Sequence, residues 1–160
     1  MKLPQIIPFI TITILTLFII SCSENNKLQT NEISQQENEQ AFNKTLDKHL
    51  NAIVNKDLDA LKSTMSPDGK MQLIMQGTEI INSVDSFINF HEGWFQDTLW
   101  TMETKVLRTE IGNTIGLAVT ESMYREPERN GEPYYNRMIV TYALEKNNDK
   151  WCIINDHAST

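Results

Sequence analysis

The chain closes on the stretch WCIINDHAST (residues 151–160), in which an apolar, strand-forming run leads directly into polar residues. Side chains alternate between the two faces of a regular strand. One face then carries Trp151, Ile153, Asn155 and His157, and the other carries Cys152, Ile154, Asp156 and Ala158. Asp156 and His157 therefore point to opposite sides, unless a bulge or the strand end falls at Asn155. An adjacent Asp–His pair is not expected.

These two polar residues each have a functional and a structural interpretation. His157 is a candidate acid/base group at the mouth of a cavity, because the ordinary pKa of histidine lies near neutrality. A strand-end histidine bonded to the backbone is the commoner alternative. Asp156 is a candidate for the same role, and its alternative is an aspartate in a salt bridge or a turn cap.

Three upstream runs have the same strand character as the closing stretch. They cover residues 100–108, 114–125 and 134–145, and they are rich in β-branched and aromatic residues. The segments IGN (111–113), RNGEP (129–133) and NNDK (147–150) supply turn-forming residues between the runs. The pattern predicts four strands in an antiparallel meander.

The residues before this meander have helical spacing. Phe42, Leu46, Leu50 and Ile53 recur at steps of four, four and three, which is one face of an amphipathic helix. Asp57 is the predicted cap of a short second helix, and Ser83 that of a third helix running to about Gln96. KMQLIMQ (70–76) and TEII (78–81) predict two short strands or a small hairpin. The fold class is therefore α+β, with helices packed on one face of a sheet.

This order of elements, ending in WCIINDHAS, resembles the nuclear transport factor 2-like superfamily, and within it the SnoaL-like group. The resemblance covers about residues 39–160. It implies a cone-like fold, in which three helices pack on a strongly curved, mainly antiparallel sheet around a cavity. Members of the superfamily include isomerases, cyclases, dehydratases and binding or dimerisation modules, so the fold does not decide the function.

Further candidates for a site lie on the predicted third helix and on the strands. Glu121 is a candidate general base if it faces the cavity, whereas an ion pair with Arg137 or Arg125 is the commoner outcome. His91 lies on the apolar face of the third helix, where a core histidine is the usual reading. The candidates for lining the ligand pocket are His91, Trp94, Trp100, Tyr124, Arg137 and Tyr142.

No metal or cofactor is expected from the sequence. HEGWF (91–95) lacks the second histidine of the zinc-protease motif, and the three histidines do not have metal-ligand spacing. The chain also lacks a phosphate-binding glycine loop, a G-x-S-x-G motif and a C-x-x-C motif.

The N-terminus predicts export. Lys2 precedes a charge-free, largely apolar run over residues 3–21, which is the anatomy of a secretory signal. The sequence LFIISCSEN (17–25) resembles the bacterial lipoprotein signal, which implies that Cys22 is lipidated and anchors the chain to a membrane. An uncleaved membrane helix is the alternative. We expect a signal peptide at 1–21, a flexible tether at 22–38 and one domain at 39–160.

The chain carries a formal net charge of −7 and has no Lys/Arg cluster, which argues against nucleic acid as a partner. A lipid-anchored location in the bacterial cell envelope, periplasmic or at the outer membrane, is expected. The leading functional hypothesis is non-enzymatic binding of a small, partly apolar ligand or a partner protein. The alternatives are an isomerase, cyclase or dehydratase that uses a pocket carboxylate or histidine as general base, and a homodimerisation module.

Overall fold

The computed structural model describes residues 15–77 and 79–160, and it divides the chain into two units, Met1–Glu37 and Asn38–Thr160. The predicted signal peptide falls mostly on residues 1–14, and these lie outside the described residues, as does the side chain of Cys22. The signal and the lipidation therefore stay predictions. Within the described part of the chain, every helix is too short or too polar to cross a membrane.

The first helix, α1 (Leu15–Val54), is longer than the apolar spacing predicts. It includes residues 22–38, for which the sequence predicts a tether. That segment contains neither proline nor glycine, so no residue in it interrupts a helix. The boundary between the two units falls next to the predicted start of the domain at residue 39.

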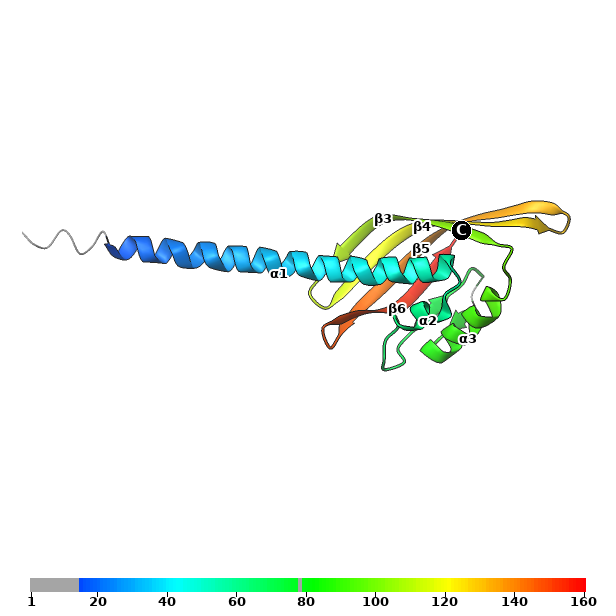
Figure 1. Cartoon of the computed structure of the whole chain (residues 1–160), viewed down its shortest axis with the longest axis horizontal. Coiled ribbons are helices and arrows are strands. Elements are labelled where there is room, and N and C mark those ends of the chain that lie inside the picture. Colours follow the sequence, from blue (N-terminus) through cyan, green and yellow to red (C-terminus); the bar gives the residue numbers. More distant parts are fainter. Residues whose placement is uncertain (1–14, 78) are drawn as a thin grey trace, which may run out of the picture. The chain divides into compact units, whose positions relative to one another are not determined.

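The second unit is built on a six-stranded sheet with the order β2-β1-β6-β5-β4-β3 (Figure 1). Its strands are β1 (Gln72–Ile74), β2 (Ile80–Ile81), β3 (Thr101–Ile111), β4 (Ile115–Arg129), β5 (Glu132–Asn147) and β6 (Lys150–Ser159). All neighbouring strands are antiparallel except β1 and β6, which are parallel. The four predicted strands are confirmed; each runs past its predicted C-terminal end, and β3 and β4 begin one residue later than predicted.

The closing strand β6 contains a bulge that changes which residues share a face. Leu144 pairs with Ile153, whereas Ala143 pairs with Asn155, so Ile154 is the extra residue. Ile153 and Asp156 consequently both point to the buried side. The prediction that they lie on opposite faces is wrong for this reason. Asp156 and His157 do point to opposite sides, since Asp156 is buried and His157 is exposed.

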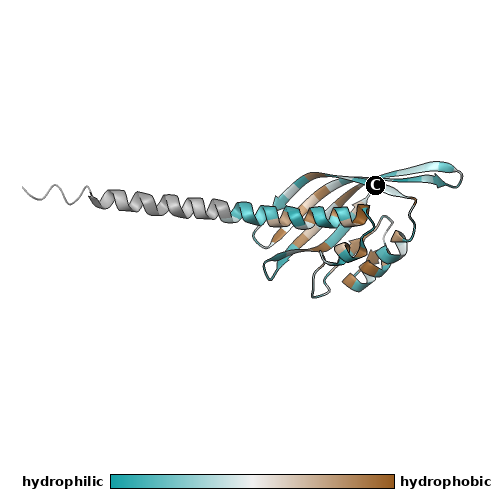
Figure 2. Cartoon of the chain, in the orientation of Figure 1, coloured by the Kyte–Doolittle hydropathy of each residue, from teal (hydrophilic) through white to brown (hydrophobic). Residues whose placement is uncertain are grey.

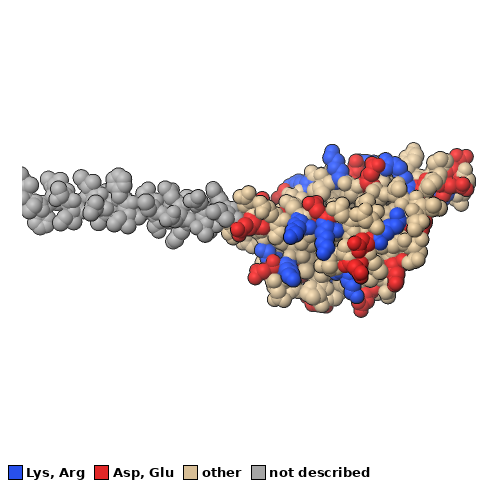
Figure 3. Space-filling model, in the orientation of Figure 1, with Lys and Arg blue, Asp and Glu red and all other residues tan. Residues whose placement is uncertain are grey.

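The helices cover the concave face of the curled sheet, as predicted. α2 (Leu58–Lys62) begins after the cap Asp57, whose side chain accepts a hydrogen bond from the Ala60 amide. α3 (Val84–Phe95) begins after the cap Ser83. Figure 2 shows the hydrophobic residues concentrated on α3 and on the strands beneath the helices. On the face that Figure 3 shows, acidic and basic side chains are interspersed.

Gly116 on β4 lets α1 lie close to the sheet, and we expect Gly116→Ala to destabilise the domain. A Cβ at this position would stand 2.6 Å from Cε2 of the fully buried Phe42 and 3.1 Å from the Glu110 carbonyl oxygen. Overpacking of this kind costs about 1–3 kcal/mol, measurable by urea denaturation. Gly93→Ala is the matched control, because a Cβ there meets nothing within 4 Å. Equal effects at the two glycines would contradict the close packing.

Candidate functional site

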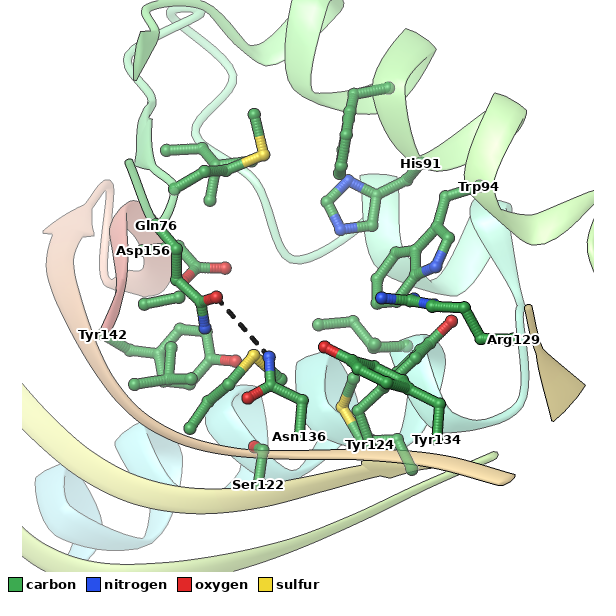
Figure 4. Close-up of a pocket in the computed structure, with 18 residues that line it drawn as sticks. Gln76, His91, Trp94, Ser122, Tyr124, Arg129, Tyr134, Asn136, Tyr142 and Asp156 are labelled. Atoms are coloured by element: carbon green, nitrogen blue, oxygen red, sulfur yellow. Dashed lines mark hydrogen bonds between the residues drawn. The ribbon is translucent and has the colours of Figure 1, made fainter. Parts of the chain in front are cut away.

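A cavity of about 390 Å³ lies between α3, the segment after β1 and the concave face of the sheet (Figure 4). Its lining is mostly apolar and aromatic, with a few polar groups, which is the usual composition of a small-molecule site. The lining residues are Ile53, Leu73, Met75, Gln76, Phe90, His91, Trp94, Met102, Ser122, Tyr124, Arg129, Tyr134, Asn136, Met138, Val140, Tyr142, Asp156 and Ala158.

The face of β4 that carries Ser122 and Tyr124 lines the cavity, which decides a question that the sequence left open. Glu121 lies on the opposite face, where it forms an ion pair with Arg137. Neither Glu121 nor Arg137 is among the lining residues. Glu121 and Arg137 therefore do not have the cavity positions for which they were candidates. Side chains alternate along a strand, so residues directly next to an inward-facing position point outward.

Of the aromatic candidates, Trp94, Tyr124 and Tyr142 line the cavity, but Trp100 does not. Trp100 is fully buried behind Trp94, and the two indole rings stack with centroids 4.4 Å apart. The Trp100 indole N–H donates to the Trp94 carbonyl at 3.3 Å. Trp100 therefore supports the wall of the cavity and is not part of its lining.

Asp156 is the one carboxyl group among the described residues that line the cavity. It is 6% exposed, and burial raises its pKa to about 7. Within the described residues, no protein group donates a hydrogen bond to its side chain. Its partner across the strands is Tyr142, whose own pKa is raised by burial and by the nearby Asp156 charge. Since His157 lies outside the cavity, the two candidates of the closing strand are separated by the structure.

His91 reaches the cavity from α3 and is 2% exposed. Its Nδ1 donates a hydrogen bond to the Phe87 carbonyl oxygen at 2.8 Å, and Figure 4 shows the ring directed into the cavity. Burial lowers the pKa of His91 to about 4, so the ring is neutral at pH 7. With Nδ1 carrying the proton, Nε2 is a bare hydrogen-bond acceptor.

A second buried histidine, His49 on α1, was not among the sequence candidates. The Thr64 hydroxyl donates its proton to the Leu61 carbonyl oxygen, so His49 Nδ1 donates to Thr64 Oγ1 at 2.8 Å. Burial lowers the pKa of His49 to about 3. It lies outside the lining, beside the ring of Tyr142, and its Nε2 is without a partner in the described structure. Its helical position beside the Leu46–Leu50 face is the signal that places it in the core.

The rim of the cavity carries a polar cluster that the sequence candidates included only through Tyr124. The Tyr124 hydroxyl donates to Glu126 at 2.7 Å, and Arg129 pairs with both carboxylate oxygens of Glu126. The Arg129 guanidinium also lies 3.5 Å from the ring centroid of Tyr134. A bulge in β4 between Glu126 and Arg129 turns this arginine toward the cavity. Such a bulge is not readable from alternation alone.

Across the described residues, His, Cys, Asp and Glu side chains do not gather in any group of three that could hold a metal ion. The one cysteine with a described side chain, Cys152, is buried and unpaired, and burial raises its pKa. The chemistry that the cavity offers is therefore that of one buried carboxyl, a neutral histidine acceptor and several tyrosine hydroxyls.

Comparison with solved structures gives the fold. A ketosteroid isomerase-like protein from Erwinia carotovora atroseptica SCRI1043 is 14% identical, with a TM-score of 0.62 over 74% of this chain and 92% of that one. An NTF-2 like protein of unknown function from Shewanella oneidensis MR-1 is 19% identical, with a TM-score of 0.61 over 76% and 98%. An LEH-like epoxide hydrolase from M. tuberculosis is 15% identical, with a TM-score of 0.58 over 77% and 85%.

At these identities the likeness shows the fold alone, which is the nuclear transport factor 2-like cone. No curated protein matches the chain. The family model of the SnoaL-like domain matches residues 42–160, which is most of the second unit. The chain therefore belongs to the SnoaL-like domain family.

Proposed function

We propose that the domain binds a small, partly apolar molecule in the cavity, and that Asp156 contacts it directly. The observation that carries this proposal is a buried carboxyl without a hydrogen-bond donor in the lining of an apolar, aromatic cavity of about 390 Å³. A carboxyl that opens into a cavity and receives no hydrogen bond from the described protein groups is available to a ligand.

Native mass spectrometry of the protein purified from its source tests this proposal. A retained molecule of constant mass is expected on the wild-type chain. Met138→Ala, which enlarges the cavity, should lower the fraction of protein that carries the retained molecule. Asp156→Asn should lower this fraction as well. Glu121→Gln, which removes the same charge outside the cavity, should leave the occupancy unchanged. If no molecule is retained, and none binds when a mixture of small apolar compounds is added, the proposal is wrong.

Acid–base catalysis is the second candidate function, and the carboxyl of Asp156 favours it. A pKa of about 7 suits a group that must both accept and release a proton at neutral pH. Among the structural neighbours are a ketosteroid isomerase-like protein and an epoxide hydrolase. In this candidate, Asp156 removes a proton next to a carbonyl group, and a tyrosine hydroxyl such as that of Tyr142 stabilises the oxyanion.

Deuterium incorporation next to the carbonyl of simple cyclic ketones in heavy water, followed by NMR, separates catalysis from binding. If Asp156 is a general base, the wild-type chain should exchange these protons and Asp156→Asn should lose at least a hundredfold in rate. Retained ligand without any exchange would leave binding as the function and remove the catalytic candidate.

We further propose that the domain is held at the bacterial cell envelope through a lipid on Cys22. The signal-like run before Cys22 supports this location. Cys22→Ser is expected to move the protein from the membrane fraction to the soluble fraction, since the acyl chains supply the anchoring. Fractionation and immunoblotting measure the change. A chain that stays in the membrane after this substitution would favour the uncleaved helix.

A further inference from the structure

Two of the buried side chains that line the cavity can act as hydrogen-bond acceptors toward a ligand. Asp156 approaches from β6 and His91 from α3, and Figure 4 shows both side chains directed into the same space. Each is more than nine-tenths buried. Nδ1 of His91 is occupied by the Phe87 carbonyl, so its Nε2 can only accept while the ring is neutral. Asp156, when ionised, can only accept as well.

Among the described residues that line the cavity, no unpaired positive charge is available to these two acceptors. Arg129 is the lining residue with a permanent positive charge in the described structure, and both carboxylate oxygens of Glu126 already pair with it at the rim. The Asn136 side-chain amide donates a hydrogen bond to the Gln76 side-chain oxygen at 3.5 Å, and neither group carries a charge. A buried carboxylate without a cation is costly, and a ligand that brings the cation removes the cost.

We propose that the cavity binds a small organic ammonium ion, whose N–H groups donate to the Asp156 carboxylate and to Nε2 of His91. The apolar body of the ligand lies against the rings of Trp94, which contacts the His91 ring with centroids 5.6 Å apart, and of Tyr124 (Figure 4). The whole chain carries a formal net charge of −7, which attracts cations. This inference rests on the proposed function and names the class of ligand.

Three probes that share one phenyl-containing body test the charge preference by isothermal titration calorimetry. They are 2-phenylethylamine, which is cationic at pH 7, the neutral 2-phenylethanol and the anionic phenylacetate. The amine is expected to bind at least tenfold more tightly than the alcohol, and the anion should bind most weakly. Asp156→Asn should abolish the preference for the amine. Glu121→Gln should keep it, because that residue carries the same charge outside the cavity.

Proton release gives an independent readout at the same site. At pH 7 a carboxyl with a pKa of about 7 is half protonated, so binding of the amine should release about half a proton. Titrations in buffers of different ionisation enthalpy measure this number. The release should vanish in Asp156→Asn and persist in Glu121→Gln.

The contribution of His91 is tested by comparing 2-phenylethylamine with its trimethylated form, which has no N–H group. A preference for the primary amine that His91→Phe removes supports the hydrogen bond to Nε2. If 2-phenylethanol binds as tightly as the amine, the ammonium inference is wrong while ligand binding stands. If none of the probes binds and native mass spectrometry finds no retained molecule, the proposed function fails as well.

Discussion

Asp156→Asn is expected to stabilise the ligand-free domain by about 4 kcal/mol at pH 8, although it removes a polar group from the candidate site. Burial raises the pKa of Asp156 from the ordinary 3.8 to about 7. Each pKa unit of that difference corresponds to about 1.4 kcal/mol in the free energy of unfolding. A raised carboxyl pKa means that the folded state disfavours the charged form. The destabilisation is therefore complete above pH 7, shrinks as the pH falls below 7, and vanishes near pH 3.8.

Urea denaturation at several pH values measures this effect. The difference between Asp156→Asn and the wild type should fall by more than half between pH 8 and pH 5. Glu121→Gln should not stabilise the domain at pH 8, because Glu121 lies outside the cavity and the substitution breaks its ion pair with Arg137. A difference between Asp156→Asn and wild type that stays constant with pH would contradict a buried, unpaired carboxyl.

The two buried histidines make the stability of the domain depend on pH with the opposite sign. Urea denaturation at several pH values measures this effect as well. Burial lowers the pKa of His49 to about 3 and that of His91 to about 4, from an ordinary value of 6.5. Only the unfolded chain takes up these protons, so stability is present above pH 6.5 and is lost as the pH falls from 6.5 toward 4. In wild type, the protonation of Asp156 offsets part of this loss. The acid-side loss of stability should therefore be steeper in Asp156→Asn.

Local chemistry explains why the secondary structure was largely readable from the sequence. Ser83 caps α3 and Gln96 ends it, as the apolar spacing and the cap residue predict. The turn residues at Asn130 and Gly131 adopt positive φ angles between β4 and β5, as a tight connection requires. These signals act over a few residues, so one sequence carries them completely.

Local patterns do not predict which face of β4 points into the cavity, nor do they predict the bulge at Ile154. Both faces of β4 carry apolar residues, so alternation gave two equivalent assignments, and packing against α1 selects the face of Gly116. The bulge depends on the pairing of β6 with β5. The parallel pairing of β6 with β1 likewise joins segments far apart in the sequence. Tertiary contacts, which local patterns do not report, therefore decided that Asp156 and not Glu121 faces the cavity.

Trp100→Ala is expected to destabilise the domain by about 3–5 kcal/mol, the range for removing a large buried aromatic side chain. Trp100 is fully buried and stacks on Trp94, with an angle of 14° between the ring planes. The ammonium group of Lys56 lies 3.7 Å from the Trp100 ring centroid and donates to the Trp100 carbonyl at 2.9 Å. The substitution thus removes packing, a cation–π contact and the support of the cavity wall together.

Two further variants separate these contributions. Lys56→Met keeps the indole packing but loses both the cation–π contact, worth about 0.5–2 kcal/mol, and the hydrogen bond to the Trp100 carbonyl, so its loss of stability should still be below that of Trp100→Ala. Trp100→Phe fills most of the space and should fall between the two. Because Trp94 lines the cavity and Trp100 backs it, Trp100→Ala should also weaken binding of 2-phenylethylamine at a temperature where the variant is folded. Unchanged binding in a folded, destabilised Trp100→Ala chain would show that the position of Trp94 does not depend on the stacked indole behind it.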